Sequence, residues 1–193
     1  MILLASASPR RRELLNQLGV PHRAVPVDID ETPLPGEPVE ALVCRLALDK
    51  ARALAAKTVA ELPVLGADTL ISLDGRPLGK PADRADGMAM LAQLSGREHE
   101  VLSAVALVVG GREALRLNRN RVRFRELEPA ECAAYWTTGE PADKAGAYAI
   151  QGRAAMFVSR LEGSYTGVMG LPLFETSELL REAGVALLEL GDS

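Results

Sequence analysis

Three consecutive arginines, Arg10 to Arg12, lie at the start of an expected helix near the N-terminus. A short apolar strand over residues 2–5 runs into this helix, for which Ser8 is a suitable N-cap and Pro9 a suitable first residue. Positive charge is unfavourable at that end, because the unpaired N–H groups and the helix dipole already make it positive. The pattern therefore suggests a phosphate-bearing ligand, with three solvated arginines as the alternative.

Asp68 is the second candidate, because it interrupts an apolar strand expected over residues 63–73. An ionised carboxylate there is costly unless it is paired, hydrogen-bonded or bound to a metal, so a purely structural role stays open. The acidic loop that contains Asp30 and Glu31 could supply a second carboxylate. Carboxylates that share a cation with phosphate oxygens are typical of a Mg²⁺ or Mn²⁺ site.

Two lysines complete this set of candidates. In a helix expected over residues 38–57, Lys50 falls in the middle of an apolar stripe formed by Val39, Val43, Leu46 and Leu54. Lys50 either extends to the edge of the helix or reaches a polar pocket beneath it. Lys80 follows a short strand of the hairpin that the dipeptide at residues 74–75 predicts. Such a set suits a metal-bound polyphosphate attacked by water.

The elements that must position these residues alternate between strands and helices. Further strands are expected over residues 22–27, 100–109, 115–127, 154–160 and 185–190, and further helices over residues 84–95, 129–136 and 171–182. Residues 138–152 should form an ordered loop, and a glycine-punctuated stretch over residues 163–170 leads into the last helix. Strands beside strands as well as beside helices predict a mixed α/β fold. We expect an elongated, twisted sheet flanked by helices, with two lobes and a central cleft, in one domain over residues 1–193.

Composition excludes several classes of protein. The net charge of −4, with one Trp, three Tyr and three Phe, argues against a nucleic-acid partner. No apolar run approaches the roughly 18 residues of a membrane span, and there is no signal-peptide pattern. Cys44 and Cys132 lie far apart, and His22 and His99 lie outside any motif, which disfavours a zinc site and nucleophilic catalysis. We expect a cytoplasmic protein with no membrane partner.

Five short segments carry a more specific signal: residues 6–11 (SASPRR), 66–69 (GADT), 79–81 (GKP), 139–152 (GEPADKAGAYAIQG) and 163–172 (GSYTGVMGLP). In residues and in order they resemble the Maf family of nucleoside triphosphate pyrophosphatases, from the first strand to the last helix. The resemblance implies hydrolysis of a nucleoside triphosphate to the monophosphate and pyrophosphate. It also implies a divalent cation (Mg²⁺, Mn²⁺ or Co²⁺), a homodimer, and a fold related to the inosine triphosphate pyrophosphatases.

The resemblance also implies roles for individual residues. Asp68 would be the general base or a metal ligand, and Glu31 would be the second metal ligand. The phosphate chain would be held by Ser8, Arg11, Lys50, Lys80 and Lys144. For Lys144 an alternative stays open, in which it pairs with Asp143 or Glu140 and only orders the loop.

Three further positions, Arg10, Thr69 and Gln151, match the branch of the family that hydrolyses dTTP and UTP rather than 7-methyl-GTP. A glutamine amide can donate to and accept from a pyrimidine edge at once, which gives Gln151 a physical reason to be there. The leading hypothesis is therefore a dTTP and UTP pyrophosphatase. The alternative is a nucleotide-binding regulator of cell division or septum formation with little turnover.

Overall fold

The computed structural model describes residues 1–58 and 62–187 of the chain. Within them, seven strands form one mixed sheet in the order β2-β1-β3-β5-β6-β7, with β4 paired to β3. The strands are β1 (Ile2–Ala5), β2 (His22–Ala24), β3 (Val64–Leu73), β4 (Arg76–Leu78), β5 (Glu98–Val109), β6 (Arg112–Phe124) and β7 (Val158–Glu162). The helices are α1 (Pro9–Gln17), α2 (Val39–Ala55), α3 (Arg84–Leu94), α4 (Pro129–Trp136), α5 (Tyr165–Met169) and α6 (Leu173–Glu182), with 3-10 helices η1 (Ala145–Ala147) and η2 (Arg153–Phe157).

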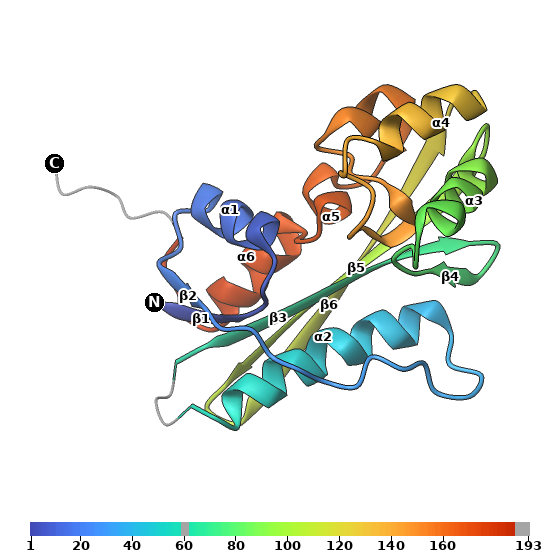
Figure 1. The fold of residues 1–193 in the computed structure, drawn as a ribbon. Helices are drawn as coiled ribbons and strands as arrows, with labels where there is room; N and C mark the ends of the chain where they lie inside the picture. Colours follow the sequence, from blue (N-terminus) through green and yellow to red (C-terminus); the bar gives the residue numbers. More distant parts are fainter. Residues whose placement is uncertain (59–61, 188–193) are drawn as a thin grey trace, which may run out of the picture.

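Three long strands run through the whole molecule. β3, β5 and β6 contain 10, 12 and 13 residues, and the parallel strands β1 and β2 extend the sheet at one end (Figure 1). β5 and β6 are joined by Gly110 and Gly111, which both have positive φ, as a tight hairpin turn requires. The long strands therefore form the frame on which the two ends of the molecule are built.

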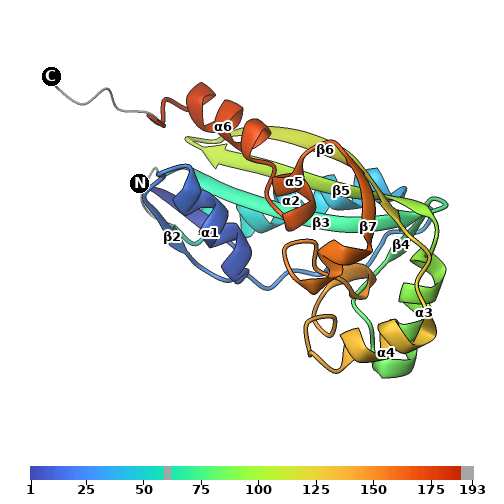
Figure 2. The same cartoon turned by 90° about the horizontal axis from the view of Figure 1, so that it is seen from above.

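Helices cover both faces of the sheet. α2 lies on one face, where its stripe of Val39, Val43, Ala47 and Leu54 is buried against β1, β3 and β5. α1, α5 and α6 lie on the opposite face (Figure 1). At the far end of the long strands, α3 and α4 gather with the 3-10 helices into a second lobe (Figure 2), whose core includes Tyr135, Tyr148 and Phe157. This arrangement confirms the mixed α/β fold with an elongated sheet and two lobes. No helix in the described ranges has the length and apolarity needed to cross a bilayer.

Two of the expected strands form over only about half of their predicted residues. The strand expected over residues 22–27 ends at Ala24, because Pro26 has no N–H group with which to continue the ladder. The strand expected over residues 154–160 begins only at Val158, and the apolar residues before it form η2. A short apolar run does not distinguish a strand from a helical turn, and here Ala154 and Phe157 are both buried at the three-residue spacing of a 3-10 helix.

The C-terminal part also differs from expectation. The glycine-punctuated stretch over residues 163–170 contains the short helix α5, which the glycines concealed in the sequence. Its N-cap is Ser164, whose side chain accepts a hydrogen bond from Gly167 N. Residues 185–187 do not form the expected strand, and residues 188–190 lie outside the described residues.

Candidate active site

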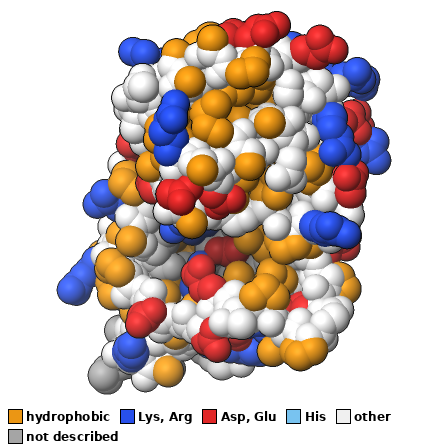
Figure 3. Space-filling view, turned by 45° about the vertical axis from the view of Figure 1, so that its right-hand side comes forward, with side chains coloured by type: hydrophobic (Ala, Val, Ile, Leu, Met, Phe, Trp, Pro, Cys, Tyr) orange, Lys and Arg blue, Asp and Glu red, His pale blue; other side chains and the backbone are white. Residues whose placement is uncertain are grey.

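A cavity of about 610 Å³ opens where one edge of β3 has no neighbouring strand. One edge of β3 pairs with β5 over residues 64–72. The other edge pairs with β1 over residues 64–66 and with β4 over residues 71–73, which leaves residues 67–70 unpaired on that side within the described chain. In the space-filling view this face is hollowed in the middle, with acidic and basic side chains in and beside the hollow (Figure 3). The volume of the cavity lies in the range of small-molecule sites.

The structure brings together all ten of the site residues proposed from the sequence. They line this one cavity and are Ser8, Arg10, Arg11, Glu31, Lys50, Asp68, Thr69, Lys80, Lys144 and Gln151. Their roles stay predictions, but the segments that carry them converge.

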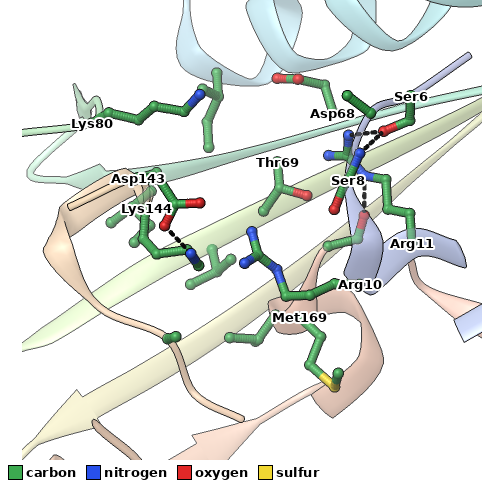
Figure 4. Close-up of a pocket in the computed structure, with 18 of the residues that line it drawn as sticks. Ser6, Ser8, Arg10, Arg11, Asp68, Thr69, Lys80, Asp143, Lys144 and Met169 are labelled. Carbon is green, nitrogen blue, oxygen red and sulfur yellow. Dashed lines mark hydrogen bonds and ion pairs between the residues drawn. The ribbon is translucent and has the colours of Figure 1, made fainter. Parts of the chain in front are cut away.

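Arg11 reaches the cavity from the first turn of α1. Its Nε donates to the carbonyl oxygen of Gly170 at 2.8 Å, and its Nη1 donates to Ser6 Oγ at 3.3 Å (Figure 4). Burial lowers the pKa of Arg11, the Asp68 carboxylate opposes that shift, and the neighbouring Arg10 adds to it. Because an arginine side chain stays protonated, the cavity contains a partly desolvated positive charge that an anion would stabilise.

The start of α1 differs from expectation in one detail. Ser8 and Pro9 occupy the predicted N-cap and first helical positions, but the Ser8 hydroxyl makes no capping hydrogen bond. Instead, Ser8 N donates to Ser6 Oγ at 3.1 Å. The Ser8 side chain therefore remains available to a ligand in the cavity that it lines.

Lys50 extends from α2 into the polar pocket, which decides between the two alternatives left by the sequence. Its Nζ lies 2.6 Å from Asp68 Oδ1 and 2.7 Å from Glu31 Oε1. The Asp68 side chain is only 9% exposed, whereas that of Glu31 is 58% exposed. Lys50 thus neutralises the buried carboxylate of Asp68. The exposed carboxylate of Glu31, from the loop before α2, contacts the same ammonium group.

Gly66 makes this contact possible. A Cβ atom at Gly66 would lie 2.2 Å from the backbone oxygen of Ala47 and 2.7 Å from the backbone nitrogen of Ala51. The backbone of α2 therefore packs directly on β3. Because Lys50 lies between these two alanines in sequence and Asp68 lies two residues beyond Gly66 on the same strand face, this close approach brings their side chains together.

Three further cations approach the cavity from different segments. The side chains of Arg10, Lys80 and Lys144 point toward its centre (Figure 4). Lys144 also forms an ion pair with Asp143, so it both lines the cavity and orders its own loop. That hydrogen bond with Lys144 holds the pKa of Asp143 below its usual value.

The donor set fits a hard divalent cation that is shared with a ligand. Asp68 and Glu31 converge on one ammonium group, and their second oxygens make no hydrogen bond with the described residues. No group of three or more potential metal-ligating side chains occurs in the described ranges. Mg²⁺ commonly binds through one or two carboxylates together with substrate phosphates, so two protein carboxylates are sufficient for such a site.

Sequence reasoning missed two contributors. The Gly170 carbonyl orients Arg11 from 159 residues away. The motif over residues 163–172 contains Gly170, but the sequence does not show which backbone group of that motif contacts Arg11. Asp143 lines the cavity beside Lys144. The sequence named it as a possible partner of Lys144 but not as a cavity residue, because acidic residues are common in exposed loops.

The chain is similar to one protein family and to several known proteins. Residues 1–183 match the family described as "Maf-like protein". The dTTP/UTP pyrophosphatase of Aromatoleum aromaticum is 54% identical, over 96% of this chain and 97% of the relative. The dTTP/UTP pyrophosphatase of Alkalilimnicola ehrlichii is 56% identical, over 94% of this chain and 92% of the relative. Among solved structures, the nucleoside-triphosphatase / dITP/XTP pyrophosphatase of Mycobacterium abscessus is 27% identical with a TM-score of 0.40, over 64% of this chain and 72% of that one.

Proposed function

The chain belongs to the Maf family, and we propose that it hydrolyses dTTP and UTP to the nucleoside monophosphate and pyrophosphate. The two relatives described above carry this activity in their names and align with nearly the whole chain. The observation that carries the proposal is a single cavity that contains both Arg11, at the start of α1, and the Lys50–Asp68 pair, on α2 and β3.

The carboxylate in this cavity is suited to proton transfer. Asp68 Oδ1 is held by Lys50 at 2.6 Å, while Oδ2 makes no hydrogen bond with the described residues. Oδ2 can accept a proton from a water molecule directed at the α-phosphorus. Lys50 fixes the orientation of the carboxylate, because Nζ is itself held by Glu31 on its other side.

The cations account for the phosphate end of the substrate. Arg11, Lys80 and Lys144 would bind the phosphate chain and neutralise the charge that develops on the departing pyrophosphate. The Ser8 hydroxyl and the backbone N–H groups at the start of α1 add donors of the type that phosphate oxygens accept. A divalent cation held by Asp68 and Glu31 would supply further charge neutralisation at the phosphates.

The remaining predicted residues account for the nucleoside end. Arg10, Thr69 and Gln151 line the same cavity. A pyrimidine offers both donors and acceptors along its edge, and the arginine, hydroxyl and amide groups provide matching partners.

We also propose that the active form is a homodimer, as the resemblance implies. Light scattering coupled to gel filtration would test this.

Product analysis tests the function directly. The protein is incubated with UTP, dTTP, CTP, ATP and GTP in the presence of Mg²⁺, Mn²⁺ or Co²⁺, and the nucleotide and phosphate products are identified. We expect UMP and dTMP with equimolar pyrophosphate. Nucleotide binding without turnover, or release of orthophosphate, would contradict the proposal and favour a binding role or another hydrolase.

A matched pair of variants tests the role of Asp68. Asp68→Asn should lower kcat by a factor of about 10² to 10⁴, the usual contribution of general base catalysis. Asp74→Asn makes the same chemical change in the exposed hairpin turn between β3 and β4, outside the cavity, and should leave kcat unchanged. Unchanged pyrophosphate release by Asp68→Asn would remove Asp68 from the mechanism.

A further inference from the structure

A buried hydrogen-bond chain connects the cavity to α5 through Ser103. Thr69 on β3 lies directly opposite Ser103 on β5 in the antiparallel register. Thr69 Oγ1 and Ser103 Oγ are 2.8 Å apart, and Ser103 Oγ donates to the carbonyl oxygen of Gly167 at 2.6 Å. Ser103 is fully buried, whereas Thr69 lines the cavity. Ser103 therefore cannot contact a ligand and can act on one only through its hydrogen-bond partners, Thr69 and Gly167.

The direction of both hydrogen bonds is fixed by the number of protons available. Two oxygen atoms at 2.6 Å need a proton between them, and the Gly167 carbonyl has none, so the single hydroxyl proton of Ser103 points to Gly167. The contact of 2.8 Å between Ser103 and Thr69 needs a proton as well. Only the Thr69 hydroxyl can provide it. Thr69 thus donates its proton to Ser103. Toward a ligand in the cavity, the Thr69 oxygen can therefore only accept hydrogen bonds.

This polarity restricts what Thr69 can bind. Phosphate oxygens only accept hydrogen bonds, so an acceptor-only Thr69 cannot hold the phosphate chain. Within the described residues Thr69 Oγ1 has no other hydrogen-bond partner, so its lone pairs are available to a donor on the nucleoside. Uracil and thymine carry a hydrogen on N3, whereas N3 of cytosine is itself an acceptor.

We propose that Ser103 is a specificity-determining residue that holds the Thr69 hydroxyl as an acceptor for N3–H of uracil and thymine and thereby excludes cytosine. The inference rests on the proposed function, because it concerns the base preference of that same site. A site built to accept from a ring N–H rejects an analogue without it, since two facing acceptors repel each other and both lose their solvation. Without Ser103, the Thr69 hydroxyl can rotate and donate to N3 of cytosine instead.

The experiment compares kcat/KM for UTP and CTP in four proteins: the wild type, Ser103→Ala, Thr69→Val and the double variant. We expect the wild type to prefer UTP strongly, and Ser103→Ala to reduce the UTP-to-CTP ratio by about tenfold or more, mainly by raising the value for CTP. In the Thr69→Val background, where the hydroxyl is already gone, Ser103→Ala should change the ratio by less than about twofold. A full additional effect of Ser103→Ala in that background would overturn the proposal.

Ser164→Ala is the matched control for a merely structural role. Ser164 Oγ holds the same residue of α5 by accepting from Gly167 N at 3.0 Å, but no hydrogen bond joins it to Thr69 among the described residues. If Ser103 acted only by securing α5, Ser164→Ala would shift the base preference equally, and the proposal would be wrong. We expect Ser164→Ala to leave the UTP-to-CTP ratio unchanged.

A second measurement needs no variant and stays informative if Ser103→Ala does not fold. The wild type is given N3-methyl-UTP, which lacks the N3 hydrogen, and should hydrolyse it with a kcat/KM at least about tenfold below that for UTP. Equal hydrolysis of the two, or equal hydrolysis of UTP and CTP, would refute the proposal. If Thr69 bound a sugar hydroxyl instead, Ser103→Ala would change UTP and CTP turnover in parallel. Failure of the wild type to convert UTP to UMP and pyrophosphate would instead refute the proposed function.

Discussion

The close packing of α2 on β3 leads to a prediction about Gly66→Ala. The added Cβ would lie 2.2 Å from the Ala47 oxygen, which is backbone and has no rotamer by which to move away. The helix would have to withdraw by about 1 Å to restore an ordinary contact. Overpacking of this kind typically costs about 1 to 3 kcal/mol, and the upper end applies where backbone meets backbone. The same withdrawal would lengthen the 2.6 Å contact between Lys50 and Asp68 beyond hydrogen-bonding distance.

Thermal unfolding and kinetics measure the two consequences separately. For a chain of this size, about 3 kcal/mol corresponds to a fall in Tm of roughly 6 to 12 °C. At a temperature where the variant is fully folded, kcat/KM should still be at least about tenfold lower, because the carboxylate has lost its fixed orientation. Gly79→Ala is the control for stability, since a Cβ at Gly79 meets nothing within 4 Å. A Gly66→Ala protein with the wild-type Tm and activity would show that the approach of α2 does not position Lys50.

Two further predictions concern single charged groups. Arg11→Lys should raise KM about tenfold, because one ammonium group cannot replace the two bonds that orient the guanidinium, whereas Arg12→Lys, at an exposed residue outside the cavity, should leave KM unchanged. Burial lowers the pKa of His99 from 6.5 to about 4. The unfolded state therefore binds the proton more readily below pH 6.5, so His99 should make the protein about 2 kcal/mol less stable at pH 5 than at pH 8. Urea unfolding of the wild type and His99→Gln at both pH values checks this, and an identical loss in the two proteins would contradict it.

The fold was predictable where one signal dominated a segment. The apolar stripe around Lys50 indicated α2, and Ser8 and Pro9 marked the start of α1. Prediction failed where a strand and a helical turn share the same pattern of apolar residues. The apolar run before Val158 suits a strand as well as a 3-10 helix, and tertiary packing of Phe157 in the second lobe decides between them.

The candidate site was predictable as a set of residues, because charges in unfavourable places need partners. Arginines at the start of α1 and a carboxylate inside β3 each indicated an absent counter-charge. The partners of those charges were less accessible to sequence reasoning. Lys50 was left with two possible positions until the structure showed its contact with Asp68. The motif over residues 163–172 did not show that its Gly170 carbonyl orients Arg11.

The cavity lies where one edge of β3 is unpaired, and the alternation of side chains along a strand does not predict that position. Neighbouring residues of a strand point to opposite faces, so Asp68 meets Lys50 of α2 on one face, while Thr69 meets Ser103 and α5 on the other. In a continuous sheet these two side chains would be separated by a layer of backbone. Here the edge of β3 is unpaired over residues 67–70, so a ligand at that edge can contact side chains from both faces. The interval between the end of β1 and the start of the β3–β4 pairing therefore lets one cavity combine a carboxylate for chemistry with a hydroxyl for recognition.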